Sequence, residues 1–391
     1  MGGNKITRRT IVTRESTERA FLVSVATRGS SNTFSTEDSQ DELAHLAGTA
    51  GAEVVGKLIQ HLPVPSKAHY IGKGKLEELL ALKDSVGYDV AIFDDELSPL
   101  QQRNLEETLQ VKVIDRAALI LDIFARRAQT REGQLQVELA QHQYLLPRIA
   151  GQWSHLERLG GGIGTRGPGE SQLETDRRLI RQKIHRLNQQ IEKVRQHRQL
   201  HRQKRIRSGI PIIALVGYTN AGKSTLLNAL SQAEVSVEDK LFTTLDPTTR
   251  RLTLPDKSVV LLSDTVGFIR KLPPTIVTAF RATLEELDEA TLLLHVVDLT
   301  SRNAPEQCQT VEEVLADLNL LDKPRITALN KIDLLLPGGR SWEEQEALNY
   351  LSDRHDVTNE NTVLISAAKK WGLTGLLELV KRTIKEKVAF F

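Results

Sequence analysis

Several residue types and patterns are scarce in the 391-residue sequence, and each scarcity excludes a class of protein. The single cysteine, Cys308, excludes an internal disulfide and a cysteine-based metal cluster. No run of about eighteen apolar residues occurs, so the sequence offers no candidate transmembrane helix. Residues 1–5 lack the apolar core of a signal peptide, and we therefore expect a cytosolic (cytoplasmic) protein.

What remains is the composition of a globular protein with more than one domain. Hydrophobic residues make up 40% and charged residues 26% of the chain, whose length suffices for two or three complete cores. Changes in periodicity predict a flexible tail over residues 1–18 and a small parallel-sheet α/β domain over 19–115. They further predict a helical hairpin with a glycine-rich loop over 116–208 and a doubly wound α/β domain over 209–391.

The N-terminal domain is predicted from strands that alternate with helices. Apolar strands near residues 20–26, 52–62, 90–93 and 111–114 are separated by helical stretches around 37–47, 76–84 and 99–109. The turn at residues 71–75, Ile-Gly-Lys-Gly-Lys, has two interpretations, a phosphate site at a helix start and a plain glycine-rich turn. We favour the second because no complete phosphate-loop pattern is present.

The hairpin is predicted from two apolar seams with helical spacing. Leu135, Leu139, His142 and Leu146 form the first, and Ile180, Ile184, Leu187, Ile191 and Val194 form the second. Residues 160–169, which contain six glycines and a proline, separate two long antiparallel helices.

The second of these helices is strongly basic. Residues 166–207 contain thirteen Lys or Arg against four Asp or Glu. A solvated helical face is the simplest explanation, but binding to a phosphate backbone accounts equally well for so large an excess. Because the segment has almost no aromatic residues, structured RNA suits it better than single strands.

A phosphate loop follows in the expected context, between an apolar strand near 210–216 and a helix near 223–230. The pattern G-x-x-x-x-G-K-[ST] is formed by Gly217, Tyr218, Thr219, Asn220, Ala221, Gly222, Lys223 and Ser224. The glycines permit a turn whose amides surround phosphate. Lys223 is expected to reach the β- and γ-phosphates and the Ser224 hydroxyl to bind Mg²⁺.

Two further segments suit the sensing of a third phosphate. The first is Phe242, Thr243, Thr244, Leu245 and Asp246, where Thr244 is the predicted magnesium ligand and Thr243 the alternative. The second is the D-x-x-G motif Asp264, Thr265, Val266 and Gly267, in which the acid lies on the metal side and the Gly267 N–H meets the γ-phosphate. Catalytic roles are thus predicted for Lys223, Thr244 and Gly267, with Ser224 and Thr244 as metal ligands.

Two later motifs predict the base. In Asn330, Lys331, Ile332 and Asp333, the Asp333 carboxylate only accepts hydrogen bonds, so it pairs with the two Watson–Crick-edge N–H groups of guanine. In Ser366, Ala367 and Ala368, the Ala367 N–H is placed to reach the guanine carbonyl. Four motifs in order, each at a predicted strand end, indicate a GTP-binding domain.

One position departs from the small signalling GTPases. Phe268 follows Gly267, where those proteins carry the Gln that orients the attacking water. Unaided hydrolysis is therefore expected to be slow, on the order of 10⁻³ s⁻¹ or below. We expect the missing group to come from a partner or a bound ion. Asn220 resembles the phosphate-loop Asn of GTPases that recruit K⁺, and a turn-stabilising Asn is an equally good interpretation.

The chain from about residue 19 onward resembles the HflX family of ribosome-associated GTPases. The resemblance is carried by residues 135–141 (LQVELAQ), 164–178 (GTRGPGESQLETDRR), 217–224 (GYTNAGKS) and 264–269 (DTVGFI). It implies binding to the large ribosomal subunit and its RNA, with a role in ribosome splitting, rescue or subunit maturation. It also implies that the loop around Arg166 approaches ribosomal RNA.

These observations predict a magnesium-dependent, monomeric GTPase that engages ribosomal RNA through its N-terminal domain and hairpin. Two alternatives remain open: a GTP-regulated RNA-binding scaffold with negligible turnover, and an ATP-driven RNA-remodelling enzyme. Stimulation of phosphate release by ribosomes separates the first from a GTPase, and competition by ATP identifies the second.

Overall fold

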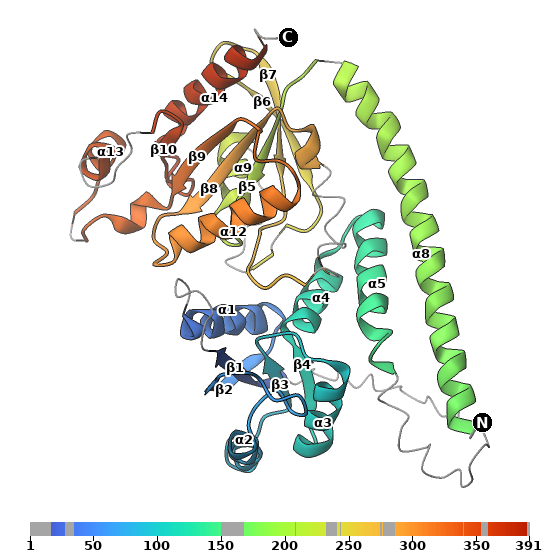
Figure 1. Ribbon diagram of the computed structural model, residues 1–391. Coiled ribbons are helices and arrows are strands. Elements are labelled where there is room, and N and C mark those ends of the chain that lie inside the picture. Colours follow the sequence, from blue (N-terminus) through green and yellow to red (C-terminus); the bar gives the residue numbers. More distant parts are fainter. Residues whose placement is uncertain are drawn as a thin grey trace, which may run out of the picture.

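The computed structural model shows two sheets, each flanked by helices, and one long helix that runs beside both (Figure 1). The described residues are 17–27, 35–149, 168–207, 209–231, 241–242, 244–273, 276, 286–338, 340–352 and 359–388; for 168–173, 197, 199–207 and 387–388 the description covers the backbone only. The predicted roles of Arg166 and Thr243 and most of the tail and glycine-rich loop lie outside these residues.

The N-terminal sheet has four parallel strands in the order β2-β1-β3-β4. Its strands are β1 (Arg19–Thr27), β2 (Glu53–Leu62), β3 (Val90–Phe93) and β4 (Lys112–Asp115), and its crossover helices are α1 (Thr36–Thr49), α2 (Lys73–Val86) and α3 (Pro99–Leu109). Alternate residues of β1 are buried on opposite faces: Leu22 packs with α1, and Phe21 with α2 and α3. The predicted parallel-sheet α/β domain is confirmed.

Three helices that pack in this unit begin at a residue whose side chain caps them. The Ser35 hydroxyl accepts a hydrogen bond from the Asp38 N–H at 3.0 Å at the start of α1. Ser98 and Gln101 form a reciprocal capping box at α3, which has a proline in its first turn. Asp115 accepts from the Ala118 N–H at 2.9 Å. Each cap satisfies an amide that the helix leaves unpaired, which explains these boundaries.

The first arm of the predicted hairpin consists of two helices, α4 (Arg116–Arg127) and α5 (Arg131–Leu145). The helical conformation is interrupted between them because Thr130 caps the start of a new helix: its hydroxyl accepts a hydrogen bond from the Gly133 N–H at 3.0 Å. Ile120 and Phe124 of α4 are fully buried in the cluster that contains Leu22 of β1. Helix α4 therefore packs on the N-terminal sheet, and the antiparallel pair of helices consists of α5 and α8, to which the word hairpin refers below.

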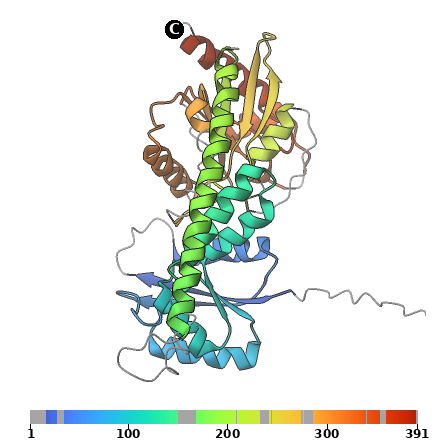
Figure 2. The same ribbon diagram turned by 90° about the vertical axis from the view of Figure 1, so that its right-hand side faces the viewer.

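Helix α8 (Pro168–Arg207) is antiparallel to α5 and extends along both units, that is, along the N-terminal and the C-terminal sheet with their flanking helices (Figure 2). Ion pairs fix the direction: Arg198 lies 3.3 Å from Glu132, and Lys183 lies 2.7 Å from Glu138. Between these pairs, apolar residues from the two predicted seams pack together: Leu135, Leu139, Ile184, Leu187, Ile191 and Val194. The helix is 40 residues long, so most of its length projects beyond its 15-residue partner.

The C-terminal sheet has six strands in the order β10-β9-β8-β5-β7-β6, of which β6 runs antiparallel to β7. Its strands are β5 (Ile212–Val216), β6 (Thr248–Thr253), β7 (Val259–Asp264), β8 (Leu292–Asp298), β9 (Arg325–Asn330) and β10 (Thr362–Leu364). Its helices are α9 (Lys223–Ser231), α12 (Ala304–Asp317), α13 (Glu344–Ser352), α14 (Leu373–Val388) and the 3₁₀ turn η1 (Ile332–Leu335). Residues of α9 and α14 cover one face and α12 the other, so the predicted doubly wound α/β architecture is confirmed.

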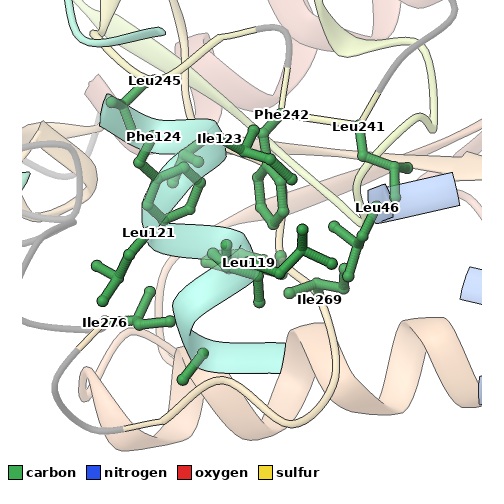
Figure 3. Close-up of a cluster of buried hydrophobic side chains, with 14 of the residues drawn as sticks. Leu46, Leu119, Leu121, Ile123, Phe124, Leu241, Phe242, Leu245, Ile269 and Ile276 are labelled. Atoms are coloured by element: carbon green, nitrogen blue, oxygen red, sulfur yellow. The ribbon is translucent and has the colours of Figure 1, made fainter. Parts of the chain in front are cut away.

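One hydrophobic cluster joins the two units (Figure 3). The ring of Phe124 on α4 meets the ring of Phe242 edge-on, with centroids 4.8 Å apart. Leu46 and Leu119 of the N-terminal unit lie in the same cluster as Ile269 of the C-terminal unit. Each fully buried side chain of this size contributes about 1.5–3 kcal/mol. The segments around Phe242 and Ile269 are therefore part of a core shared by both units.

Candidate nucleotide-binding site

The loop from β5 to α9 turns sharply at two glycines. Gly217 has φ 151° and Gly222 has φ 94°. A Cβ atom on Gly217 would lie 2.3 Å from the carbonyl oxygen of Val296, and one on Gly222 would lie 2.3 Å from Asn330 Nδ2. Only glycine fits either position. The loop and the first turn of α9 line a hollow together with later segments: Thr219, Asn220, Gly222, Lys223, Ser224, Thr225, Phe242, Thr244, Thr265 and Gly267.

Lys223 places a buried cation at the base of this hollow. Its Nζ donates to the carbonyl oxygens of Gly217 at 3.1 Å and Tyr218 at 2.8 Å. Burial lowers the pKa of Lys223 to about 8, although the Asp264 carboxylate opposes this shift. A phosphate group would restore the favourable environment that the ammonium lost on burial, and the positive end of α9 adds to the attraction.

Three oxygen-bearing side chains converge beside Lys223, and they suit a magnesium ion. Ser224 Oγ lies 2.8 Å from Thr244 Oγ1, and Asp264 Oδ2 lies 2.6 Å from Ser224 Oγ and 2.9 Å from Thr244 Oγ1. The other carboxylate oxygen, Asp264 Oδ1, is buried and has no hydrogen-bond partner among the described residues. Burial raises the pKa of Asp264, and a cation would offset that cost. Hard oxygen ligands in small number are what Mg²⁺ uses beside nucleotide phosphates.

The D-x-x-G segment lies directly against the phosphate loop. The Thr219 N–H donates to the Phe268 carbonyl at 2.7 Å, and the Phe268 N–H donates to the Gly217 carbonyl at 3.1 Å. A Cβ on Gly267 would lie 2.6 Å from Thr219 Cα and 3.0 Å from Lys223 Nζ, so this position also requires glycine. The Phe268 side chain is buried in the shared core, away from the hollow. Residue 268 therefore offers no group to orient water.

Asn330 connects the phosphate loop to the last motif. Its Nδ2 donates to the Ala221 carbonyl at 2.9 Å, and its Oδ1 accepts from the Ala367 N–H at 3.0 Å. The Ser366 hydroxyl donates to Asp333 Oδ1 at 2.6 Å, which orients that carboxylate. The ends of β5, β9 and β10 thus bring the predicted base-binding residues beside the predicted phosphate-binding residues.

Other predicted site residues point elsewhere. The Tyr218 phenol hydrogen-bonds Glu42 on α1, and Asp246 accepts hydrogen bonds from residues 129 and 130 before α5. Ala368 is exposed. Four predicted site residues have buried side chains that pack in the core: Ala221, Leu245, Val266 and Ile332. The hydroxyl of Thr265 donates to the Leu215 carbonyl at 2.6 Å.

Sequence reasoning missed two residues at this site. Thr225 lines the hollow one position beyond the phosphate-loop motif, where the first turn of a helix predicts exposure toward an anion. Asp298 ends β8, and its carboxylate lies 2.7 Å from Lys331 Nζ. The available signal was that Asp298 directly follows the apolar run at residues 292–297, because in such sheets ligands lie at strand carboxyl ends.

The turn at residues 71–75 has an internal partner. The Gly72 N–H at the start of α2 donates to Gln60 Oε1 at 2.8 Å. This contact agrees with its interpretation as a plain glycine-rich turn.

Comparison with known proteins agrees with this geometry. The N-terminal model of a family described as GTP-binding GTPase matches residues 37–125, its middle-region model matches 127–205, and a model described as 50S ribosome-binding GTPase matches 212–331.

Among the described residues, none of the helices combines the length and the apolar composition that a membrane span needs.

The fold and site define a GTPase with a phosphate loop. A protein of Caldanaerobacter subterraneus named GTPase HflX is 51% identical over 369 residues, covering 94% of this chain and 81% of that one. GTPase HflX of Escherichia coli is 44% identical and covers 90% and 80%. A GDP complex of a GTP-binding protein from Sulfolobus solfataricus is 26% identical with a TM-score of 0.46, covering 94% and 99%. The chain belongs to the HflX family of GTPases.

Proposed function

We propose that this GTPase is a magnesium-dependent switch that binds the large ribosomal subunit when it carries GTP and leaves after hydrolysis. Its role would be in ribosome splitting, rescue or subunit maturation, as a cytoplasmic monomer. The observation that carries the switch is the convergence of Ser224, Thr244 and Asp264 within 2.6–2.9 Å beside Lys223. Thr244 comes from a segment separate from the loop, so a third phosphate can be sensed there.

The residues divide the chemistry among them. Lys223 and the loop amides stabilise charge on the γ-phosphoryl oxygens as water attacks in line. Ser224 and Thr244, which both contact Asp264, would hold Mg²⁺, and the ion would neutralise charge on the β- and γ-phosphates. The Gly267 N–H would donate to the γ-phosphate. Asp333 selects guanine through its two N–H groups.

Water must be oriented by a group outside position 268, because the Phe268 side chain lies in the core. We propose that the ribosome or a K⁺ ion near Asn220 completes the site. Asn220 has φ 62° and is exposed at the rim of the hollow. Turnover without ribosomes should therefore stay on the order of 10⁻³ s⁻¹ or below.

The basic helix α8 is the proposed RNA contact. Arg178 and Arg181 are exposed and Arg177 is partly exposed on α8. A long positive helix beside both units can follow a phosphate backbone. The name 50S ribosome-binding GTPase of the matched model supports a ribosomal partner.

Sedimentation with purified 50S subunits tests the proposal. The wild-type chain with the GTP analogue GMPPNP should pellet with subunits, and with GDP it should remain in the supernatant. Arg177, Arg178 and Arg181 changed together to Ala should weaken association and reduce the salt-dependence slope by about three units. Lys67, Lys257 and Lys385 changed to Ala, exposed but off α8, are the matched control. Equal pelleting with both nucleotides would contradict the switch, and an unchanged slope would leave α8 as a solvated face.

A further inference from the structure

Asp246 is anchored on the hairpin and not in the nucleotide hollow. Its Oδ2 accepts from the backbone N–H groups of Gln129 at 2.7 Å and Thr130 at 2.8 Å. Its Oδ1 accepts from the Thr130 hydroxyl, the same hydroxyl that caps α5. One carboxylate thus receives three hydrogen bonds at the junction of α4 and α5. Hydrogen bonds to a charged acceptor are stronger than neutral ones, so the contact is firm.

Thr244, two residues earlier, is held at the opposite end. Its hydroxyl lies 2.8 Å from Ser224 Oγ and 2.9 Å from Asp264 Oδ2. Between the two, the Leu245 side chain is 5% exposed in the shared core (Figure 3). Two residues span at most about 7 Å, so there is little slack between the site and α5. A displacement of Thr244 must therefore displace Asp246, and a displacement of Asp246 must displace Thr244.

We propose that Asp246 is a positioning residue: it holds Thr244 at the γ-phosphate side of the site and transmits the presence of that phosphate to the α5–α8 hairpin. The inference rests on the proposed role of Thr244 as the residue that senses GTP. Binding of a third phosphate steadies Thr244, and Thr244 steadies Asp246 against the amides of Gln129 and Thr130. By reciprocity, a partner that holds the hairpin in place strengthens GTP binding.

Gly133 provides a variant that separates this role from a structural one. A Cβ added there would lie 2.4 Å from Asp246 Oδ1 and 3.3 Å from its Cγ. Gly133→Ala therefore displaces the carboxylate. The same change improves helix propensity in the first turn of α5. If the Asp246 contact served only to stabilise the fold, the gain in propensity would therefore offset its loss, and the free energy of unfolding would change little. Gly48→Ala is the matched control, since this helical glycine of α1 has open space around it.

The experiment compares GMPPNP–Mg²⁺ with GDP on the full chain, by calorimetric affinity and by hydrogen exchange at the amides of Gln129 and Thr130. In the wild type, GMPPNP should slow exchange at both amides relative to GDP. In Gly133→Ala and in Asp246→Ala that difference should vanish, and the preference for GMPPNP over GDP should fall about tenfold, within the usual range of coupling between sites. GDP affinity should stay unchanged, because GDP has no γ-phosphate. Thr130→Ser, which keeps the hydroxyl, and Gly48→Ala should behave as wild type.

An unchanged preference together with a retained exchange difference in both variants would overturn the inference. Its failure is distinct from failure of the proposed function. A chain that shows the coupling but does not pellet with 50S subunits would contradict only the ribosomal role. A chain that pellets with GMPPNP but shows no effect of Gly133→Ala would contradict only the inference. A wild-type chain that binds no GMPPNP would overturn both.

Discussion

The two sheets of this protein use the same topological position in opposite ways. Strand order reverses between β1 and β3 in the N-terminal sheet and between β5 and β8 in the C-terminal sheet. Ligands of such folds bind outside the strand carboxyl ends at this point. In the C-terminal sheet, Gly217 and Gly222 keep the position open. In the N-terminal sheet, Asp94 after β3 fills it together with other charged side chains of the chain.

The charged side chains at the N-terminal reversal pair with one another. Asp94 accepts from Arg116 Nη1 at 2.8 Å, from Ser39 Oγ at 2.7 Å and from Lys271 Nζ at 2.6 Å. Lys271 follows the D-x-x-G segment, so the GTPase unit itself occupies this position. Burial raises the pKa of Asp94, although Lys271 opposes the shift, and burial lowers the pKa of Arg116 to about 10. The comparison teaches that fold defines where a site can form, and side chains decide whether a ligand or the protein fills it.

The largest expected effect is loss of stability when the filled position is broken. Asp94→Ala removes three hydrogen bonds to a buried carboxylate, although Glu42 still pairs with Arg116, and the free energy of unfolding should fall by about 3–5 kcal/mol. Urea unfolding followed by circular dichroism measures it. Asp41→Ala is the control, because Asp41 is 68% exposed in its pair with Lys57 and should cost at most about 1 kcal/mol. Equal losses in both variants would mean that the buried cluster contributes no more than a surface pair.

A smaller effect is expected at the open position, on binding and not on folding. Asp333→Asn replaces a carboxylate oxygen with an N–H donor that faces the guanine N–H groups. GTP affinity should fall by about tenfold to a hundredfold, corresponding to about 1.5–3 kcal/mol for a charged hydrogen bond. Xanthosine triphosphate should gain affinity, because its extra carbonyl accepts from the new amide. Calorimetric titration of the variant with both nucleotides measures the two affinities. An undiminished preference for GTP would show that the base binds elsewhere.

The smallest effect is a pH dependence of GTP binding. The pKa of Lys223 is about 8 in the free site, so the ammonium that binds phosphate is present below this pH and is lost as pH rises through it. If only the charged form binds, affinity should weaken about fourfold from pH 7 to pH 8.5. For folding the sign is opposite: because the pKa is lowered, stability rises with pH between about 8 and 10.5. Lys223→Arg stays charged and should bind with a flat profile, so a slope in that variant would assign the titration to another group.

Local patterns predicted much of the fold and candidate site. Strand β3 and helix α3 have their predicted bounds, because an apolar run and a Ser-Pro helix start act over a few residues. The motif around Lys223 and the acid Asp264 were predicted together because each follows a strand in the same sheet. Tyr218 and Asp246 belong to predicted site segments, yet their side chains turn toward the N-terminal unit. The spacing of residues along the chain does not show which residue, more than a hundred positions away, will be the hydrogen-bond partner of these side chains.

The amino-acid sequence by itself determined the class of protein: which strands precede loops, where glycine is required, and which polar side chains follow the strands. These properties are local, since they depend on backbone conformation and on the chemistry of adjacent residues. Only the tertiary structure decided that α4 belongs to the N-terminal sheet, that Lys271 fills the crevice at Asp94, and that Asp246 holds the hairpin. Such contacts depend on which buried surfaces meet, because a charge removed from water must find its partner wherever the packing of both units brings one.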